Sequence, residues 1–264
     1  MIKFFDKVIE QNSFPDNSLL MKLDLSLAKM EFLSEFKIHW IYENDAELFS
    51  LICLKRHLDQ KANKPISLEL KYIPHARQDR VKNDEDIFTL KYFCEVINSL
   101  NFASVYVLDA HSNVSLSLLN NVIQYPVKSH ILNAITDSKA EALFFPDEGA
   151  MKRYANISTL PFAFGMKRRE WETGKILGLD VIQFENIMNK RVLIVDDICS
   201  RGGTFYHSAK TLKSLGTKNI SLYVTHCENT ILNGEIFTSE LINQVYTTNS
   251  LVHCEEVANK VIYV

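Results

Sequence analysis

The sequence predicts an α/β fold made of two tandem units, each with a mostly parallel sheet. Short apolar runs alternate along the chain with polar loops and with stretches of helical spacing, which is the pattern of strand–loop–helix units. The chain has 264 residues, of which 47% are hydrophobic, so it can bury a substantial core. The alternation is interrupted once, near Tyr125 and Pro126, and then resumes. We therefore expect an N-terminal domain over residues 1–126 and a C-terminal domain over 127–254.

The first half of the chain contains three expected strands, each an apolar run that ends in a polar loop. Asn44 and Asp45 form a helix-capping pair, and the leucines that follow them recur at helical spacing. Because ligands of open parallel sheets bind at the carboxyl ends of strands, these polar loops are candidate binding segments. The expected strands cover 37–42, 66–73 and 104–108, the expected helices cover 44–58 and 87–100, and the loops cover 74–80 and 109–113.

The second half repeats this organisation. Its expected strands cover 142–145, 159–164, 180–184, 192–195, 220–225 and 244–247, and its expected helices begin near residues 148 and 204. The strand at 180–184 is expected to pair back on the preceding one. The end of the chain is apolar, and the last strand, within 255–264, is a candidate to return to the N-terminal domain.

Composition excludes several classes of protein. The net charge is −3, with 29 basic and 32 acidic residues, which argues against a nucleic-acid-binding surface. The five cysteines are scattered without CxxC spacing, so reduced thiols in the cytoplasm are expected and a zinc site is not. We find neither a signal peptide nor an uninterrupted apolar run of about 18 residues, so no membrane association is expected. We therefore expect the protein to be located in the cytoplasm.

The stretch RVLIVDDICSRGGTF, residues 191–205, carries the strongest functional signal. An apolar run long enough for a buried strand is followed at once by Asp196 and Asp197, and then by a glycine-rich turn before helical spacing begins. Backbone N–H groups and the helix dipole make such a turn an anion site, while paired carboxylates accept hydrogen bonds from vicinal hydroxyls. The stretch predicts a site for a ribose 5-phosphate unit. The simpler alternative is a helix cap beside a glycine turn.

Two polar loops of the first half are candidates for nucleotide chemistry. Residues 77–80 (Arg-Gln-Asp-Arg) follow a strand and can hold the phosphates and base edge of a nucleotide, or form a surface salt-bridge cluster. Asp109 and His111 also follow a strand. They can bind Mg²⁺ together with its phosphate, although a core histidine would explain them equally well.

Two loops of the second half add charge. Residues 147–149 (Asp-Glu-Gly) begin a helix, where Mg²⁺–pyrophosphate would satisfy both the helix N-terminus and the acids; the alternative is a helix cap. Lys167 and Arg169 place two cations on one loop or ribbon. They can neutralise charge during phosphoryl transfer, or belong to a solvated charged run.

Together these loops resemble the ribose-phosphate diphosphokinases, or phosphoribosyl pyrophosphate (PRPP) synthetases, and the 191–205 stretch resembles the ribose-phosphate loop of the wider phosphoribosyltransferase superfamily. The resemblance covers most of the chain. Its most specific matches are the A-R-Q-D-R segment 76–80 and the V-D-D-x-x-x-x-G-G-T segment 195–204. The segments 109–111 (D-x-H), 146–153 (P-D-x-G-x-x-K-R) and 167–169 (K-R-R) add to it. The resemblance implies two phosphoribosyltransferase-like (Rossmann-like) domains.

The resemblance also implies roles for single residues. ATP would be held by Arg77, Gln78, Asp79 and His111, and Mg²⁺ by His111 and Asp147. The pyrophosphate loop would be Asp147, Glu148, Gly149 and Ala150, and the catalytic residues Lys167, Arg169 and His111. The ribose phosphate would be bound by Asp196, Asp197, Ser200, Arg201, Gly202, Gly203 and Thr204. The implied reaction is the Mg²⁺-dependent transfer of the β,γ-pyrophosphate of ATP to ribose 5-phosphate, giving PRPP and AMP, by a homo-oligomer.

The chain departs from the family pattern in the ribose-phosphate loop. Ser200 and Arg201 stand where the family carries Asp-Thr. Arg201 either points to solvent or reads extra negative charge on an acceptor with a second phosphate. ADP-ribose would be such an acceptor, and its product would serve NAD resynthesis. Ala150 replaces the usual glycine of the pyrophosphate loop, and Ser18 replaces a glutamate tied to the usual oligomer. Two other classes remain as alternatives: a phosphoribosyltransferase that consumes PRPP, and a non-catalytic regulatory homologue.

Overall fold

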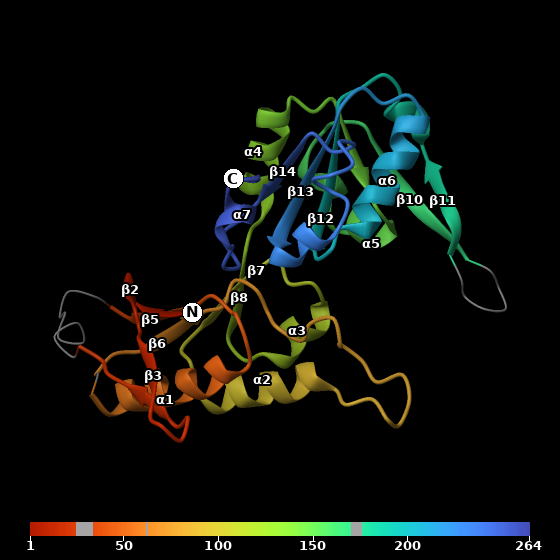
Figure 1. Ribbon diagram of the computed structural model, residues 1–264. Helices are drawn as coiled ribbons and strands as arrows, with labels where there is room; N and C mark the ends of the chain where they lie inside the picture. Colours follow the sequence, from red (N-terminus) through yellow and green to blue (C-terminus); the bar gives the residue numbers. More distant parts are fainter. Residues whose placement is uncertain (25–33, 62, 170–175) are drawn as a thin grey trace. The chain divides into compact units, whose positions relative to one another are not determined.

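The computed structural model describes residues 1–24, 34–61, 63–169 and 176–264. It has the expected α/β class with mostly parallel sheets (Figure 1). The chain divides into two compact units, one of Met1–Tyr125 with Ser250–Val252 and one of Pro126–Asn249 with His253–Val264. Each unit is described by itself.

The first unit has a six-stranded sheet, in the order β2-β1-β5-β6-β7-β8. Strands β5 to β8 are mutually parallel, β1 is antiparallel to β5, and β3 and β4 form a separate hairpin. The strands are β1 (Ile2–Phe4), β2 (Lys7–Val8), β3 (Gln11–Ser13), β4 (Leu19–Met21), β5 (Phe36–Trp40), β6 (Ile66–Glu69), β7 (Val105–Leu108) and β8 (Val122–Tyr125). The helices are α1 (Ala46–Lys61), α2 (Thr89–Ser99) and α3 (Asn113–Leu118).

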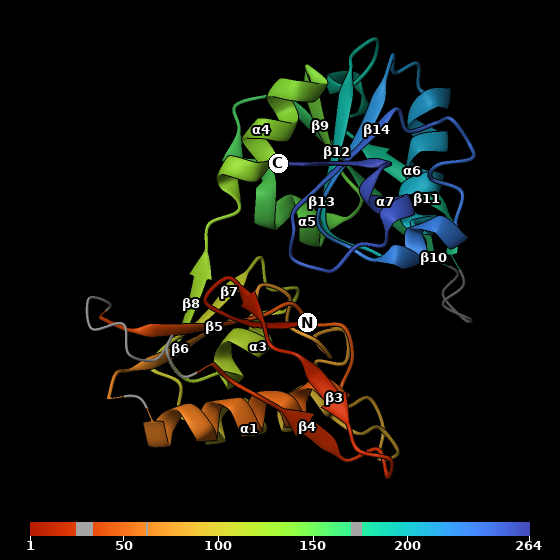
Figure 2. The same ribbon diagram turned by 60° about the vertical axis from the view of Figure 1, so that its left-hand side comes forward.

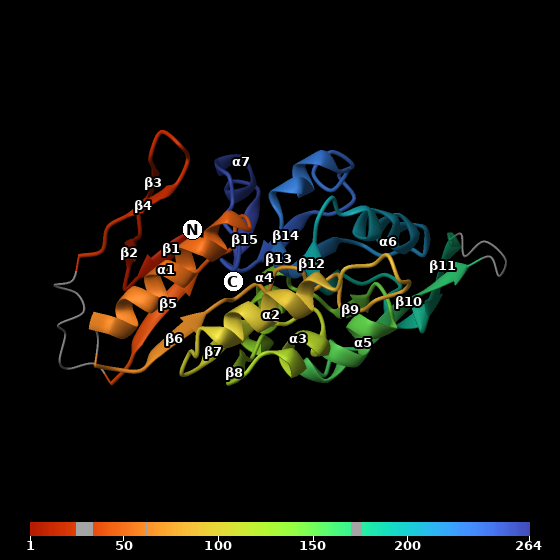
Figure 3. The same ribbon diagram turned by 90° about the horizontal axis from the view of Figure 1, so that it is seen from below.

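Helices α1, α2 and α3 lie on the same face of this sheet (Figure 3). The parallel strands follow one another in sequence order, so each right-handed crossover turns to the same side. Because the helices cover only one face of the sheet, buried and half-buried residues alternate along β5. Phe36, Ile38 and Trp40 pack into the core beneath the helices, while Lys37 and His39 are half-buried on the other face.

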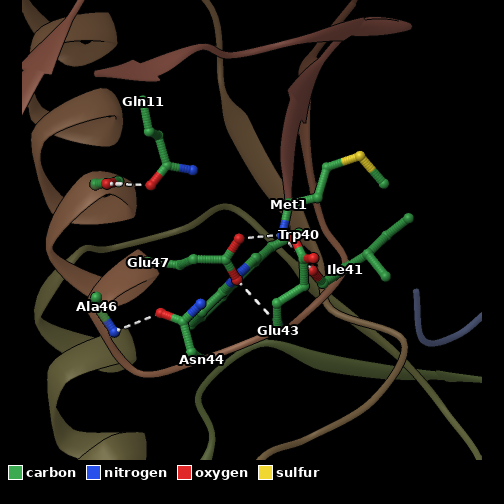
Figure 4. A network of polar contacts seen from close by, with 9 residues as sticks. Met1, Gln11, Trp40, Ile41, Glu43, Asn44, Ala46 and Glu47 are labelled. Carbon is green, nitrogen blue, oxygen red and sulfur yellow. Dashed lines mark hydrogen bonds and ion pairs between the residues drawn. The ribbon is translucent and has the colours of Figure 1, made fainter. Parts of the chain in front are cut away.

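Glu47 anchors the start of α1 against β5 (Figure 4). Its buried carboxylate accepts hydrogen bonds from Trp40 Nε1 at 2.9 Å and from the backbone N–H of Glu43 at 3.0 Å, and forms an ion pair with the amino group of Met1. Asn44 Oδ1 accepts from the N–H of Ala46 at 3.1 Å, so the expected capping role of Asn44 is confirmed. These partners satisfy a carboxylate that would otherwise be costly to bury.

The second unit has a seven-stranded sheet, in the order β11-β10-β9-β12-β13-β14-β15. All neighbours are parallel except β10 and β11, which form the expected antiparallel pair. The strands are β9 (Ala142–Phe145), β10 (Phe162–Arg169), β11 (Ile176–Ile182), β12 (Val192–Cys199), β13 (Ile220–Cys227), β14 (Gln244–Thr247) and β15 (Val261–Tyr263). The helices are α4 (Lys128–Ser138), α5 (Glu148–Tyr154), α6 (Gly203–Ser214) and α7 (Glu255–Ala258), with 3-10 turns η2 (Ala155–Ile157), η3 (Phe184–Asn186) and η4 (Asn229–Asn233).

The strand order of this sheet reverses between β9 and β12. From β9 the chain passes through α5 to β10 on one side, and from β12 it passes through α6 to β13 on the other. Opposite directions of crossover place helices on opposite faces. Helices α4 and α5 accordingly cover one face and α6 and α7 the other (Figure 2). Such a reversal opens a crevice at the carboxyl ends of the two central strands.

The end of the chain differs from one expectation. The last strand, β15, pairs in parallel with β14, with Val261 opposite Val245, so it extends the second sheet and does not return to the first unit. Its buried residue Val261 joins the same apolar cluster as α6 and α7. In the part of the chain that the structure describes, no helix is long and apolar enough to cross a bilayer.

Candidate functional site

Three carboxylates meet at the reversal point of the second sheet. Strands β9 and β12 are parallel neighbours, with Phe144 opposite Ile194, so residues that follow these positions lie at the same edge. Asp147 comes just after β9, and Asp196 and Asp197 lie in the last part of β12. The sequence predicted both groups separately, and the sheet brings them together.

Asp197 is held by an ion pair. Its Oδ2 accepts from Nη1 of Arg153 at 2.7 Å, and the Asp197 carboxylate is only 9% exposed. Arg153 lies in the last turn of α5, the helix that begins at the 147–149 loop. The pair therefore joins the two predicted phosphate loops of this unit. Asp197 was predicted as a site residue. Arg153 was noted only as the last residue of the 146–153 motif, and no role was assigned to it.

Asp196 has a different environment. Burial raises its pKa to about 8, and the neighbouring carboxylates of Asp197 and Asp147 add to the shift. Its Oδ1 accepts from the backbone N–H of Asp197 at 2.9 Å. Because burial and two neighbouring carboxylates disfavour its charged form, a ligand that brings hydroxyl donors or a cation would favour that form.

The loop after β12 presents an open helix N-terminus. Gly202 caps α6 with φ +76°, and a Cβ there would lie 2.4 Å from Cγ1 of Ile236, so this position requires glycine. Nothing lies within 4 Å of the corresponding position at Gly203. Arg201 and Thr204 are exposed beside it. Ser200 is placed differently, because its Oγ donates to Oε2 of Glu228 at 2.6 Å.

The 147–150 loop has the geometry of a helix cap. Asp147 Oδ1 accepts from the N–H of Ala150 at 3.1 Å, and a Cβ on Gly149 would lie 3.2 Å from the same oxygen. Ala150 is buried, whereas Glu148 is exposed and pairs with Lys152 at 2.8 Å. The capping interpretation is therefore correct for Asp147, whose other carboxylate oxygen is not used by this cap.

The first unit contains a charged cavity of about 370 Å³. Two loops that are far apart in the sequence form it: one follows β6, and the other, which carries His111, follows β7. Neighbouring parallel strands explain this meeting. The lining residues are Arg77, Gln78, Asp79, Arg80, Lys82, Asp86 and His111. Lys82 and Asp86 were not predicted, although they lie only a few residues after the A-R-Q-D-R segment.

Asp79 is an acid of this cavity with two side-chain hydrogen-bond partners. Its carboxylate accepts from Arg80 Nε at 2.9 Å and from Ser112 Oγ at 2.8 Å. The hydrogen bond from Arg80 is the main cause that lowers the pKa of Asp79, and Ser112 and His111 contribute. The neighbouring Gln78 accepts from Thr89 Oγ1 at 2.9 Å. The loop is thus fixed from both α2 and the start of α3.

Comparisons with known proteins agree with these motifs. No family model matches the chain. The ribose-phosphate pyrophosphokinase of Pyrococcus abyssi is 28% identical over 251 residues, which cover 92% of this chain and 84% of that protein. The enzyme of the same name from Mycoplasma pneumoniae is 26% identical over 262 residues, covering 92% of this chain and 76% of its own. Over most of its length the chain is therefore similar to ribose-phosphate pyrophosphokinases, as its motifs predicted.

A solved structure supports the fold of this family. The phosphoribosylpyrophosphate synthetase of Mycobacterium smegmatis matches with a TM-score of 0.77 at 16% identity, over 97% of this chain and 85% of that one. The fold class is confirmed by this match. The curated ribose-phosphate pyrophosphokinases also confirm the predicted enzyme class, a transferase.

Two groups of predicted site residues have not yet been located in the structure. The backbone of Lys167 and Arg169 forms the end of β10, opposite β11, but their side chains and residues 170–175 lie outside the described part. His111 belongs to the first unit and Asp147 to the second. Within the described ranges, no group of three or more His, Cys, Asp or Glu side chains is arranged to hold a metal ion.

Proposed function

We propose that this chain makes PRPP and AMP from ATP and ribose 5-phosphate, by moving the β,γ-pyrophosphate of ATP to the anomeric hydroxyl. The observation that carries the proposal is the edge of the second sheet, where Asp196 precedes an open helix N-terminus at the reversal of strand order. A phosphate at the N-terminus of α6 and vicinal hydroxyls at Asp196 together describe a ribose 5-phosphate. Nucleotide biosynthesis is the corresponding role.

In this proposal the second unit holds the acceptor. Gly202 and Gly203 let the backbone N–H groups that begin α6 approach the 5-phosphate, and the exposed Thr204 adds a hydroxyl donor. Asp196 accepts from the ribose hydroxyls. Asp197 stays bound to Arg153, so its part is to hold the edge of β12 in place.

The first unit holds ATP in the charged cavity. Arg77, Arg80 and Lys82 supply positive charge for the phosphates, while Asp79 keeps Arg80 in place through its 2.9 Å hydrogen bond. His111 lines the same cavity. A volume of about 370 Å³ is within the range of small-molecule binding sites.

The donor groups suit Mg²⁺. Asp147 of the second unit would offer the ion a carboxylate oxygen, the ligand type that Mg²⁺ prefers, and His111, the other predicted ligand, belongs to the first unit. The ion keeps water and substrate phosphates in its coordination shell. Asp147 also lies close enough to Asp196 to raise its pKa, and a cation between these carboxylates would relieve their repulsion. When bound, Mg²⁺ would neutralise phosphate charge.

Catalysis then depends on positioning and charge neutralisation. The anomeric hydroxyl attacks the β-phosphorus in line, the bond from that phosphorus to the AMP oxygen breaks, and AMP leaves. We assign Lys167 and Arg169 to the charge that builds on the transferred group. Their place on a two-stranded ribbon at the edge of the sheet, β10 with β11, supports this assignment.

ADP-ribose is the second candidate acceptor. The observation that favours it is Arg201, an exposed cation beside the open N-terminus of α6, where a second phosphate would find it. The product would then be ADP-ribose 1-pyrophosphate, a precursor for NAD resynthesis.

The deciding experiment measures AMP release by the purified protein with Mg²⁺ and ATP, with ribose 5-phosphate and ADP-ribose offered side by side. Faster release with ribose 5-phosphate supports the main proposal, and faster release with ADP-ribose supports the second. Consumption of PRPP with a base would instead reveal a phosphoribosyltransferase, and no AMP with either acceptor a non-catalytic homologue. A homo-oligomer in the cytoplasm remains a prediction, which analytical ultracentrifugation and fractionation test.

A further inference from the structure

The segment after β13 supports the loop that begins α6. Strands β12 and β13 are parallel, and their last residues, Cys199 and Cys227, lie opposite each other. The pairing continues past the strands, because the N–H of Glu228 donates to the carbonyl of Cys199 at 2.8 Å. Glu228 therefore lies beside the point where the chain leaves β12 for the glycine turn.

A side-chain hydrogen bond joins the two segments at this point. Ser200 Oγ donates to Oε2 of Glu228 at 2.6 Å. This short hydrogen bond is charge-assisted, because its acceptor is a carboxylate, and such bonds are stronger than neutral ones. Thr230 Oγ1 donates to the same oxygen at 3.0 Å, but from within the segment itself. Since a hydroxyl has one proton, Ser200 cannot donate to a bound phosphate while it donates to Glu228.

Two close backbone approaches extend this contact. A Cβ on Gly234 would lie 1.8 Å from the carbonyl oxygen of Arg201, and a Cβ on Gly202 would lie 2.4 Å from Cγ1 of the buried Ile236. Segment 228–236 thus touches the loop at Ser200, Arg201 and Gly202. These contacts fix the loop from the side of β13, which flanks β12 opposite to β9.

We propose that Glu228 is a positioning residue for the loop 200–204, which binds the acceptor phosphate in the proposed function. Glu228 acts through the hydroxyl of Ser200. It holds the turn so that the first N–H groups of α6 keep their direction toward the phosphate. The inference rests on the proposed function, because it assigns Glu228 to the acceptor site of that reaction. No step of the transfer involves Glu228 itself.

Kinetics test this role. Ser200→Ala and Glu228→Ala are each expected to raise the KM for ribose 5-phosphate by about tenfold, as for one lost charge-assisted bond, and to leave the KM for ATP unchanged. Ser200→Thr keeps the hydroxyl and is expected to restore the acceptor KM. Thr230→Val is the matched control, because it removes the other hydroxyl on the same oxygen without touching the loop; its KM values stay within about twofold of wild type.

A second readout does not depend on activity. Hydrogen–deuterium exchange of the peptide 200–206 is expected to speed up in Ser200→Ala and Glu228→Ala and to stay unchanged in Thr230→Val, at equal melting temperatures. If Glu228→Ala fails to fold, Glu228→Gln replaces it, since it keeps the size and removes the charge. An inactive wild type would overturn the proposed function, while exchange would still decide the position of the loop. Unchanged exchange, or equal rises in the KM values of both substrates, overturns the inference.

Discussion

Arg153 and Asp197 form an ion pair with a 2.7 Å bond between Nη1 and Oδ2, and this pair connects α5 to the end of β12. The Arg153 side chain is 31% exposed and that of Asp197 only 9%, so solvent screens the pair less than an ordinary surface pair. It separates the roles of two adjacent acids. Asp197 is paired with a cation inside the protein, which supports the proposal that Asp196 is the acid that meets the ligand.

Arg153→Met is expected to destabilise the protein, because it leaves the Asp197 carboxylate buried without its cation. The expected loss is about 1–3 kcal/mol in the free energy of unfolding, measured by urea denaturation. Lys152→Met is the matched control: the adjacent Lys152 is exposed and pairs with Glu148 on the same helix, so a change below about 0.5 kcal/mol is expected. Equal losses of unfolding free energy in the two variants would show that the Arg153–Asp197 pair stabilises the protein no more than the exposed pair does.

Asp196→Asn is expected to raise the melting temperature at high pH. The folded-state pKa of about 8 lies above the ordinary value of 3.8, so the folded protein binds a proton that the unfolded chain has lost. The wild type therefore loses stability as pH rises from about 4 to about 8, and the deficit is constant above that. Thermal unfolding of both proteins across this range measures the gap. A gap that does not widen with pH would contradict the raised pKa.

Arg80→Ala is expected to weaken ATP binding by about tenfold or more and to leave ribose 5-phosphate binding unchanged. Arg80 lines the cavity of the first unit and is oriented by Asp79, so its loss removes both a cation and an ordered partner. Isothermal titration calorimetry with each ligand provides the measurement. Arg56→Ala, an exposed arginine of α1 outside this cavity, is the control. Parallel loss of both ligands would remove Arg80 from the nucleotide site.

Lys167→Ala and Arg169→Ala are each expected to reduce turnover by about a hundredfold or more while the protein stays folded. Donors that act only on developing charge have effects of this size. Steady-state AMP release and circular dichroism together make the measurement. Near-normal turnover of both variants would exclude the assigned role.

Features that are determined by residues close together in the chain could be predicted from the sequence. The buried run 192–195 with its two acids, the helix at 203–214 and the capping residue Asn44 all follow from short-range pattern. Strand β6 is shorter than predicted and ends at Glu69. The segments that form α3 and β8 were not predicted as regular structure, because neither is long enough to establish a period.

Contacts between distant segments were beyond such reasoning. Arg153 reaches Asp197 from a different element, and Glu228 reaches Ser200 from the next strand. Nothing in the spacing of these residues along the chain marks them as partners. The return of the last strand was also predicted wrongly, since the apolar end 261–264 would suit an edge position on either sheet and only packing selects β14.

The order of strands has a consequence for how the two halves can change. In the second sheet the reversal between β9 and β12 creates the edge at which we propose that the acceptor binds, so the position of the proposed site is a property of the topology itself. In the first sheet the parallel strands run in sequence order, and the cavity owes its shape to the long segment 70–88 and the turn at 109–113. Nucleotide preference can therefore be re-engineered by grafting surface loops, whereas relocating the acceptor would require rebuilding a sheet.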